Sequence, residues 1–219
     1  MQPVTTGGIF KDGGMPLVAE DSRIRIVRLD VGGGMVSNAY MLVCRPTGES
    51  VVVDAPGDAG RIAAQLGGTT PRYILITHNH FDHLGALAEL KARLGVPVAA
   101  HPADRLPIEP DILLADGDTV TFGQVSLQVF HTPGHTPGSL CFYTEGFLIS
   151  GDTLFPGGPG RTSSPAALAR IIESITTRLL PLPDETRVFP GHGEPTVLKK
   201  ERAEIEHFKS RPHDPGLCG

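Results

Sequence analysis

Three histidines and one aspartate lie within six residues of this chain, in the segment Thr-His-Asn-His-Phe-Asp-His at positions 77–83. Side chains this polar and this crowded are poor core material, but neutral imidazole and carboxylate are good ligands for borderline divalent cations. In an extended segment His78 and His80 point to the same side. Asp82 and His83 follow on the next turn and can face a second position. The spacing therefore indicates two metal ions rather than one.

The residues on either side of this segment place it in the fold. Residues 73–76 form a continuous apolar run of strand length, and from Phe81 or Asp82 to Leu94 the apolar residues recur with a helical period. The histidines thus occupy a loop that leads from the end of a buried strand into a helix. Sites gather at that end of the strands in layered α/β folds, so we expect the metal ligands at one edge of such a fold.

Three more candidate ligands stand in the same context, where an apolar strand gives way to a glycine-flanked polar residue. They are His135, Asp152 and His192, each directly preceded by glycine. Glycine permits the close backbone approach that a crowded metal site needs. Loops at the ends of several strands can converge on one edge of a sheet, so these residues are expected to join the first cluster.

The seven residues divide into two sets of three and one shared member. The first set is His78, His80 and His135, the second is Asp82, His83 and His192, and Asp152 has two oxygens with which to bridge both metals. A water shared between the metals would be acidified and become a nucleophile.

Asp54 also follows a predicted strand. It can accept a hydrogen bond that orients a ligand histidine from behind. It can equally close the strand as an Asx turn, and both interpretations stay open at this point.

The rest of the chain alternates short strands with a few helices. Strands are predicted at residues 23–30, 38–44, 50–54, 96–100 and 186–189, with hairpins at 119–130 and 139–150, and helices at 59–66, 165–180 and 196–208. No linker divides the chain. Residues 1–219 are therefore expected to form a single domain, with a loose lead-in over about residues 1–20 and a short C-terminal helix and tail.

Composition limits the partners. Lys and Arg number 19 and Asp and Glu 24, for a formal net charge of −5, whereas a binder of nucleic acid would normally carry a basic face. No apolar stretch approaches the roughly 20 residues that cross a bilayer, and no secretory signal pattern is visible. Cys44, Cys141 and Cys218 form no disulfide pattern. We expect a cytoplasmic protein that binds neither nucleic acid nor membrane, with Cys44 and Cys141 in its core.

These motifs resemble those of the metallo-β-lactamase superfamily, and within it the glyoxalase II group. The resemblance runs from about Ile24 to Thr196 and rests on the 77–83 segment and on the Gly-His, Gly-Asp and Gly-His steps that follow in the same order. It implies an αβ/βα four-layer sandwich, with two mostly antiparallel sheets face to face, helices outside and metals at one edge. It also implies that all seven residues are ligands of two divalent metal ions, zinc in the first place, with iron or manganese as alternatives.

Two finer similarities point to the glyoxalase II branch, and two features depart from it. Residues 151–155 (GDTLF) are similar to the family's segment around the bridging aspartate, and Arg161 matches a basic residue near the glutathione moiety. Thr162 and Ser163 lack the aromatic character found there in glutathione-binding members. After His192 there is room for one helix and a tail, whereas typical glyoxalase II enzymes have a helical domain that supplies much of the glutathione pocket.

The leading hypothesis is a thioesterase similar to hydroxyacylglutathione hydrolase, a binuclear metallohydrolase that uses a metal-bridging hydroxide. Asp82 would accept a proton during the cycle, and Arg161 would bind an anionic part of a small thioester or ester substrate. The protein is expected to be a monomer or a homodimer.

Other functions use the same ligands differently. A mononuclear iron persulfide dioxygenase would need only His78, His135 and Asp152. Lactonase or other ester hydrolase activity ranks lower. A true β-lactamase ranks lower still, because none of the three cysteines falls at a ligand position.

Overall fold

A computed structural model describes residues 17–32 and 37–210 of the chain. Most of the expected lead-in, the tail after residue 210 and Cys218 lie outside these residues. Within the described part, the strands form two large sheets and a small ribbon.

The first sheet has mixed pairing. Within the described residues its strand order is β1 (Leu17–Glu20), β2 (Ile24–Leu29), β3 (Ala39–Cys44), β4 (Glu49–Val53), β5 (Thr70–Leu75), β6 (Val98–Ala100) and β7 (Ile112–Leu113). Strands β1 to β4 pair antiparallel, and β4 to β7 pair parallel. Helices α1 (Ala59–Gln65) and α3 (Leu87–Leu94) form the crossovers that parallel neighbours need. The expectation of a mostly antiparallel sheet is therefore wrong for this half.

The second sheet is mostly antiparallel, as expected. Its order among the described strands is β15 (Thr196–Val197), β14 (Arg187–Pro190), β11 (Phe147–Gly151), β10 (Leu140–Thr144), β9 (Val125–His131) and β8 (Thr119–Phe122). Only the β11–β14 pair is parallel, and its connection contains α4 (Pro165–Ser174) and a π-helical turn (Ile175–Leu179). A ribbon of β12 (Leu154–Phe155) and β13 (Gly158–Pro159) follows β11, and α5 (Leu198–Ser210) follows β15.

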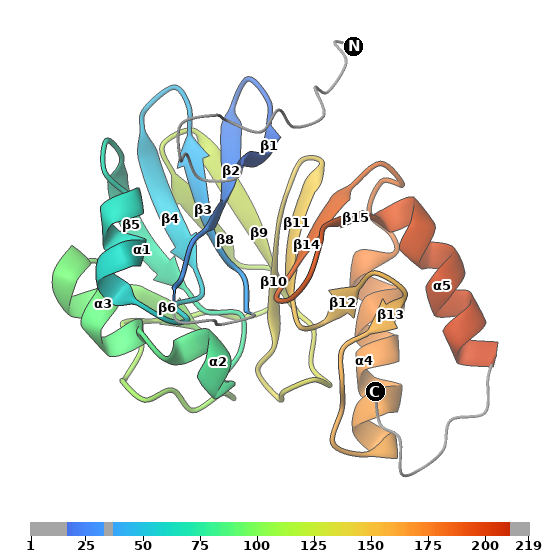
Figure 1. Ribbon diagram of the computed structural model, residues 1–219. Helices are drawn as coiled ribbons and strands as arrows, with labels where there is room; N and C mark the ends of the chain where they lie inside the picture. Colours follow the sequence, from blue (N-terminus) through green and yellow to red (C-terminus); the bar gives the residue numbers. More distant parts are fainter. Residues whose placement is uncertain (1–16, 33–36, 211–219) are drawn as a thin grey trace.

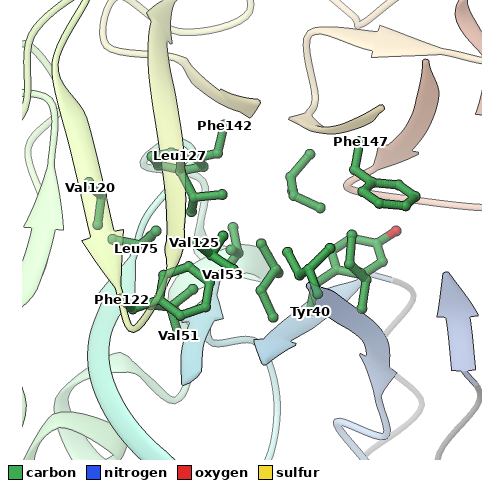
Figure 2. Packing of buried hydrophobic residues seen from close by; sticks show 14 of the residues in the cluster. Tyr40, Val51, Val53, Leu75, Val120, Phe122, Val125, Leu127, Phe142 and Phe147 are labelled. Carbon is green, nitrogen blue, oxygen red and sulfur yellow. The ribbon is translucent and has the colours of Figure 1, made fainter. Parts of the chain in front are cut away.

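The sheets pack face to face with helices on both outer surfaces, so the expected four-layer sandwich is confirmed (Figure 1). The central core joins β-branched and leucine residues of the first sheet to aromatic residues of the second, such as Val53 and Leu75 with Phe122 and Phe142 (Figure 2). Two outer cores fix α1 and α3 on the first sheet, and α4 and α5 on the second. This packing holds the strand ends in register, which is what positions the loops between them.

The predicted helix from Phe81 to Leu94 is two helices. Helix α2 (Phe81–Leu84) ends at Gly85, and α3 begins at Leu87. The Ala86 N–H donates to the carbonyl of Ala55 at 2.8 Å instead of continuing the helix. That hydrogen bond fastens the start of the helical region to the loop after β4.

Two other boundaries also differ from the prediction. The predicted helix at residues 165–180 changes to a π-helical turn at Ile175. Thr196 and Val197, expected to open the last helix, instead pair with β14 as β15, and α5 starts at Leu198. No helix in the described residues is both long and apolar enough to cross a membrane.

Phe142 tests the central core because its side chain is completely buried there. We predict that Phe142→Ala lowers the free energy of unfolding by about 3–5 kcal/mol, the range for large cavities in a packed core. Urea denaturation of the metal-free protein measures this, with Phe81→Ala as control, since Phe81 is 81% exposed. A loss below about 1 kcal/mol for Phe142→Ala would contradict this packing.

Cys141 is completely buried on β10, and burial raises the pKa of its thiol to about 11. Since only the thiolate is nucleophilic, we predict that iodoacetamide at pH 8 leaves Cys141 unmodified in the native protein and alkylates it in urea. Peptide mass spectrometry measures both. Native alkylation at the rate of a free thiol would show that this strand opens readily.

Candidate metal centre

The candidate ligands come from loops after four strands that end at the same edge of the sandwich. The 77–83 segment follows β5, His135 follows β9, Asp152 follows β11 and His192 follows β14. These segments are far apart in sequence, and the packing of the two sheets brings them together. Six of the seven residues belong to the groups that could hold a metal ion in the described chain, and Asp152 lies beside them.

Asp82, His83 and His192 form a compact triangle. The Nε2 atoms of His83 and His192 are 3.2 Å apart, and Asp82 Oδ2 lies 3.2 Å from the nitrogen of His192 and 3.8 Å from that of His83. Ligands of one tetrahedral zinc ion lie about 3.3 Å apart, given bonds of about 2.0–2.1 Å. The three atoms thus have the spacing that a single metal ion needs.

His78, His80 and His135 form the other group, with potential ligand atoms all within 4.8 Å of one another. Their rings meet nearly edge to face, with centroids 4.4–4.8 Å apart. His78 is buried, whereas His80 is exposed, so the group opens toward solvent on one side.

Asp152 lies between the two groups. Its Oδ2 is 3.5 Å from Nε2 of both His135 and His192, which belong to different groups, and its Oδ1 is 3.5 Å from Nε2 of His83. A carboxylate in this place can contact two metal ions at once.

Unsatisfied buried atoms provide a test of whether a metal fits. His78 Nε2, His135 Nε2 and Asp152 Oδ1 are buried without a hydrogen-bond partner among the described residues. Buried polar atoms are normally paired, and these three all face the region between the two groups. Imidazole nitrogens and carboxylate oxygens are the donors that divalent zinc, iron and manganese accept. The residues present therefore fit a pair of such ions.

Three of the histidines are held from behind through Nδ1. His83 Nδ1 donates to Asp54 Oδ2 at 2.8 Å, and His135 Nδ1 donates to the backbone carbonyl of Arg161 at 2.6 Å. The Thr77 hydroxyl donates to Asp54 Oδ2 at 2.7 Å, which leaves its oxygen to accept from His78 Nδ1 at 3.0 Å. A proton fixed on Nδ1 leaves the lone pair on Nε2, which is the atom that faces the site.

Asp54 supports two of these histidines, His83 directly and His78 through the Thr77 hydroxyl. It is buried, and its carboxylate also accepts the Thr77 N–H at 2.8 Å. Its φ of 63° is the one left-handed backbone angle among the described non-glycine residues, a conformation that aspartate and asparagine tolerate best. Asp54 therefore supports the site from behind. The Asx turn is wrong, because Pro56, two residues on, has no N–H to donate and the carboxylate accepts from Thr77 and His83 instead.

Burial and charge shift the proton affinities of the two groups in opposite directions. Burial lowers the pKa of His78 and His135, and neighbouring histidines lower that of His78 further. Burial alone would also lower the pKa of His83, but its hydrogen bond to Asp54 and the charges of nearby carboxylates raise it overall. A hydrogen bond to Asp152 raises the pKa of His192. The acidic residues thus gather around the second group.

Glycine is required where the site is most crowded. A β-carbon on Gly191 would lie 2.1 Å from Asp152 Oδ1 and 2.7 Å from Cε1 of His83. A β-carbon on Gly134 would lie 2.4 Å from the backbone nitrogen of Ile171 in α4. The glycines before His192 and His135 therefore let these loops approach the site and the helix that supports it.

A cavity of about 380 Å³ adjoins the site. It is lined by Asp152 and His192, by the 155–161 loop, which includes Phe155 and Arg161, and by Phe208 of α5. The backbone carbonyl of Arg161 holds His135, so the loop that shapes this cavity also supports a candidate ligand.

Sequence reasoning missed two polar residues that contact the site loops. The Ser37 hydroxyl donates to Asp82 Oδ2 at 2.8 Å, and the buried Asp104 accepts hydrogen bonds from the loops of His78 and His135. Asp104 follows a predicted strand closely, which is the signal that singled out Asp54. Nothing local marks Ser37, because its partner is 45 residues away.

This arrangement, a four-layer sandwich with histidines and aspartates gathered at one edge, is that of a metal-binding hydrolase. The chain matches the model of the metallo-beta-lactamase superfamily over residues 32–192 and belongs to that superfamily.

Individual relatives have different names. A hydroxyacylglutathione hydrolase of Anaeromyxobacter dehalogenans is 39% identical over 155 residues, which cover 70% of this chain and 60% of that protein. The crystal structure of BLEG-1, a B3 metallo-beta-lactamase, is 31% identical with a TM-score of 0.72 and covers 89% of this chain and 100% of its own. The di-iron-bound form of TTHA1623 is 36% identical with a TM-score of 0.68, over 80% of this chain and 96% of its own.

The variant Asp54→Asn tests the hydrogen bonds that hold His83 directly, and His78 through Thr77, on the side away from the candidate metals. Asparagine tolerates the left-handed backbone, but its amide group cannot accept from both Thr77 and His83. We predict that zinc affinity falls by roughly 10–100-fold, as is usual when such a partner is lost. Competition with a chromophoric chelator measures the affinity. Asp58→Asn is the control, because Asp58 only caps α1. Equal affinities in both variants would contradict the role of Asp54.

Proposed function

We propose that this protein is a binuclear metallohydrolase that cleaves a small thioester, in the manner of a hydroxyacylglutathione hydrolase. The observation that supports it most is the position of Asp152 between two complete groups of three candidate ligands, at 3.5 Å from members of both. The relative named hydroxyacylglutathione hydrolase supports the substrate class. The di-iron form of a second relative supports the number of metals.

His78, His80 and His135 would hold one ion, and Asp82, His83 and His192 the other, with Asp152 contacting both. A pair of divalent ions supplies an acidified water as nucleophile and stabilises negative charge on the substrate's carbonyl oxygen. Zinc is the first choice for this donor set, with iron and manganese as alternatives.

The protein's own groups have separate tasks in this proposal. Asp82 has a side chain that is 39% exposed, next to the second group. Burial tends to raise its pKa, but the Ser37 hydrogen bond and the neighbouring histidines lower it overall. An ionised carboxylate at the open side of the site can accept a proton from the attacking water. Asp54, Thr77 and the Arg161 carbonyl keep the histidines oriented while this happens.

The cavity beside Asp152 and His192 would receive the substrate. Phe155 and Phe208 give it apolar walls, and Arg161 gives it a positive charge. A thioester with an apolar stem and a carboxylate at its far end matches these walls. Glutathione thioesters and other acidic acyl thioesters have this character.

The alternative of a mononuclear iron persulfide dioxygenase uses His78, His135 and Asp152 alone. It leaves no task for the compact triangle of Asp82, His83 and His192, whose atoms lie 3.2–3.8 Å apart. We therefore place the hydrolase first. Esters, lactones and, because of the B3 metallo-beta-lactamase relative, lactams belong in the same assay.

The test combines metal analysis with a substrate panel. We expect two metal equivalents per chain and turnover of S-lactoylglutathione or another acyl thioester by the zinc-, iron- or manganese-loaded protein. One iron per chain with oxygen uptake on glutathione persulfide would favour the dioxygenase. Full metal occupancy without hydrolysis of any thioester would reject the proposed function.

Arg161→Ala tests the anionic end of the substrate. This change removes the guanidinium but keeps the backbone carbonyl that holds His135. A hydrogen bond to a charged group contributes about 1.5–3 kcal/mol, so we predict that KM for acidic thioesters rises roughly tenfold or more while kcat changes little. Arg170→Ala is the control, because Arg170 lies on α4 and pairs with Glu173. A KM that is unchanged for acidic thioesters would remove Arg161 from the site.

A further inference from the structure

Asp104 is a buried carboxylate that belongs to none of the groups able to hold a metal ion. It lies in the segment after β6 and is only 5% exposed. Burying a charge is costly unless it is well hydrogen-bonded. Its partners therefore indicate why the chain keeps an aspartate here.

One oxygen of this carboxylate joins two loops of the site. Asp104 Oδ2 accepts from the backbone N–H of Asn79 at 3.1 Å and from the Thr136 hydroxyl at 2.6 Å. Asn79 stands between His78 and His80, and Thr136 follows His135. A single atom thus connects the immediate neighbours of all three members of the first group.

The second oxygen extends this contact along the His135 loop. Asp104 Oδ1 accepts the Gly138 N–H at 2.8 Å. A β-carbon on Gly138 would lie 2.6 Å from the Asp104 carboxyl carbon, so the approach depends on glycine at this position. The Thr136 hydroxyl is also 2.8 Å from that of Ser139, and the two form a small buried network with the carboxylate. The loop is therefore fixed directly after His135, from Thr136 to Gly138.

The second group has different supports. Asp82 is contacted by Ser37, and His83 by Asp54. None of the hydrogen bonds that Asp104 makes among the described residues reaches the immediate neighbours of Asp82 or His192. Asp54 serves both groups, since it contacts His83 directly and His78 through Thr77, whereas the contacts of Asp104 with the ligand loops are confined to those of the first group.

We propose that Asp104 is a positioning residue of the first metal group, and that it raises the metal affinity of His78, His80 and His135 by joining their loops, without contacting the metal. The inference rests on the metal sites of the proposed function but not on its substrate. Removing the carboxylate frees the two loops to move apart, and the affinity of the first group falls while that of the second changes little.

Asp104→Asn in two single-site backgrounds tests this. Asp82→Asn weakens the second group, so the remaining tight site reports on the first, and His80→Ala does the reverse. Zinc affinity of the purified protein, stripped of metal, is measured by competition with a chromophoric chelator. We expect Asp104→Asn to lower affinity roughly 10–100-fold in the Asp82→Asn background and by less than about threefold in the His80→Ala background.

Asp21→Asn is the matched control. The Asp21 carboxylate also accepts backbone N–H groups, those of Arg23 at 2.7 Å and Ile24 at 2.9 Å, and it precedes β2 at the end of the first sheet opposite to the ligand loops. Its variant should keep the zinc affinity of the first group. Thr136→Val, which removes one of the three hydrogen bonds, gives a milder loss of affinity if Asp104→Asn fails to fold.

The outcomes separate this inference from the proposed function. Unchanged zinc affinity after Asp104→Asn, or equal losses in the two backgrounds, would overturn the role of Asp104 while the hydrolase proposal stands. A wild-type protein that binds no zinc, iron or manganese would overturn both. Normal metal affinities without thioesterase activity would overturn only the proposed substrate.

Discussion

The structure depends on one constraint, the crowding of polar atoms at one edge of the sandwich. The imidazole nitrogens of His83 and His192 lie 3.2 Å apart, and a carboxylate oxygen of Asp82 lies 3.2–3.8 Å from them. Atoms so close together and partly shielded from water do not satisfy one another's hydrogen-bonding capacity. Three buried polar atoms of the site have no hydrogen-bond partner in the described chain. A cation at their centre resolves the conflict. Three of the rings, those of His78, His83 and His135, are also held from behind through Nδ1.

The hydrogen bonds behind the rings therefore matter as much as the candidate ligands. Asp54 supports His83 directly and His78 through Thr77, and a backbone carbonyl supports His135. Asp104 connects the loops themselves. These partners come from the ends of β4 and β6 and from the loop after β13, so the geometry of the centre depends on the register of both sheets.

The two sheets in turn are held together by apolar cores that include none of the candidate ligands. The central core and two outer cores lie along the strands, whereas the polar residues gather where the strands end. Glycines make the last approach possible, as at Gly191, where any β-carbon would meet Asp152 and His83. The candidate ligands thus lie at an edge of the sandwich that is positioned by the apolar cores but is not part of them.

Much of this could be predicted from the sequence, because the hydrophobic periods of strands and helices are local. The histidines and aspartate of the 77–83 segment, together with the glycine-preceded His135, Asp152 and His192, form a combination with few uses other than metal binding. Most of the element order followed from these patterns, and the sandwich from the resemblance of the motifs to those of the metallo-β-lactamase superfamily. Local patterns gave the wrong element boundaries where a residue distant in sequence is the hydrogen-bond partner. The Ala86 N–H bonds to the Ala55 carbonyl and splits a predicted helix, and Thr196 pairs with Val188 as part of a strand.

The sequence by itself determined which side chains are suited to bind metal and at which strand ends they stand, since residue chemistry and hydrophobic period are properties of short segments. Only the tertiary structure decided which nitrogens and oxygens face one another, that Asp152 lies between both groups, and that Ser37 and Asp104 support them. Those contacts join residues 17 to 45 positions apart, and they exist only once the two sheets have packed.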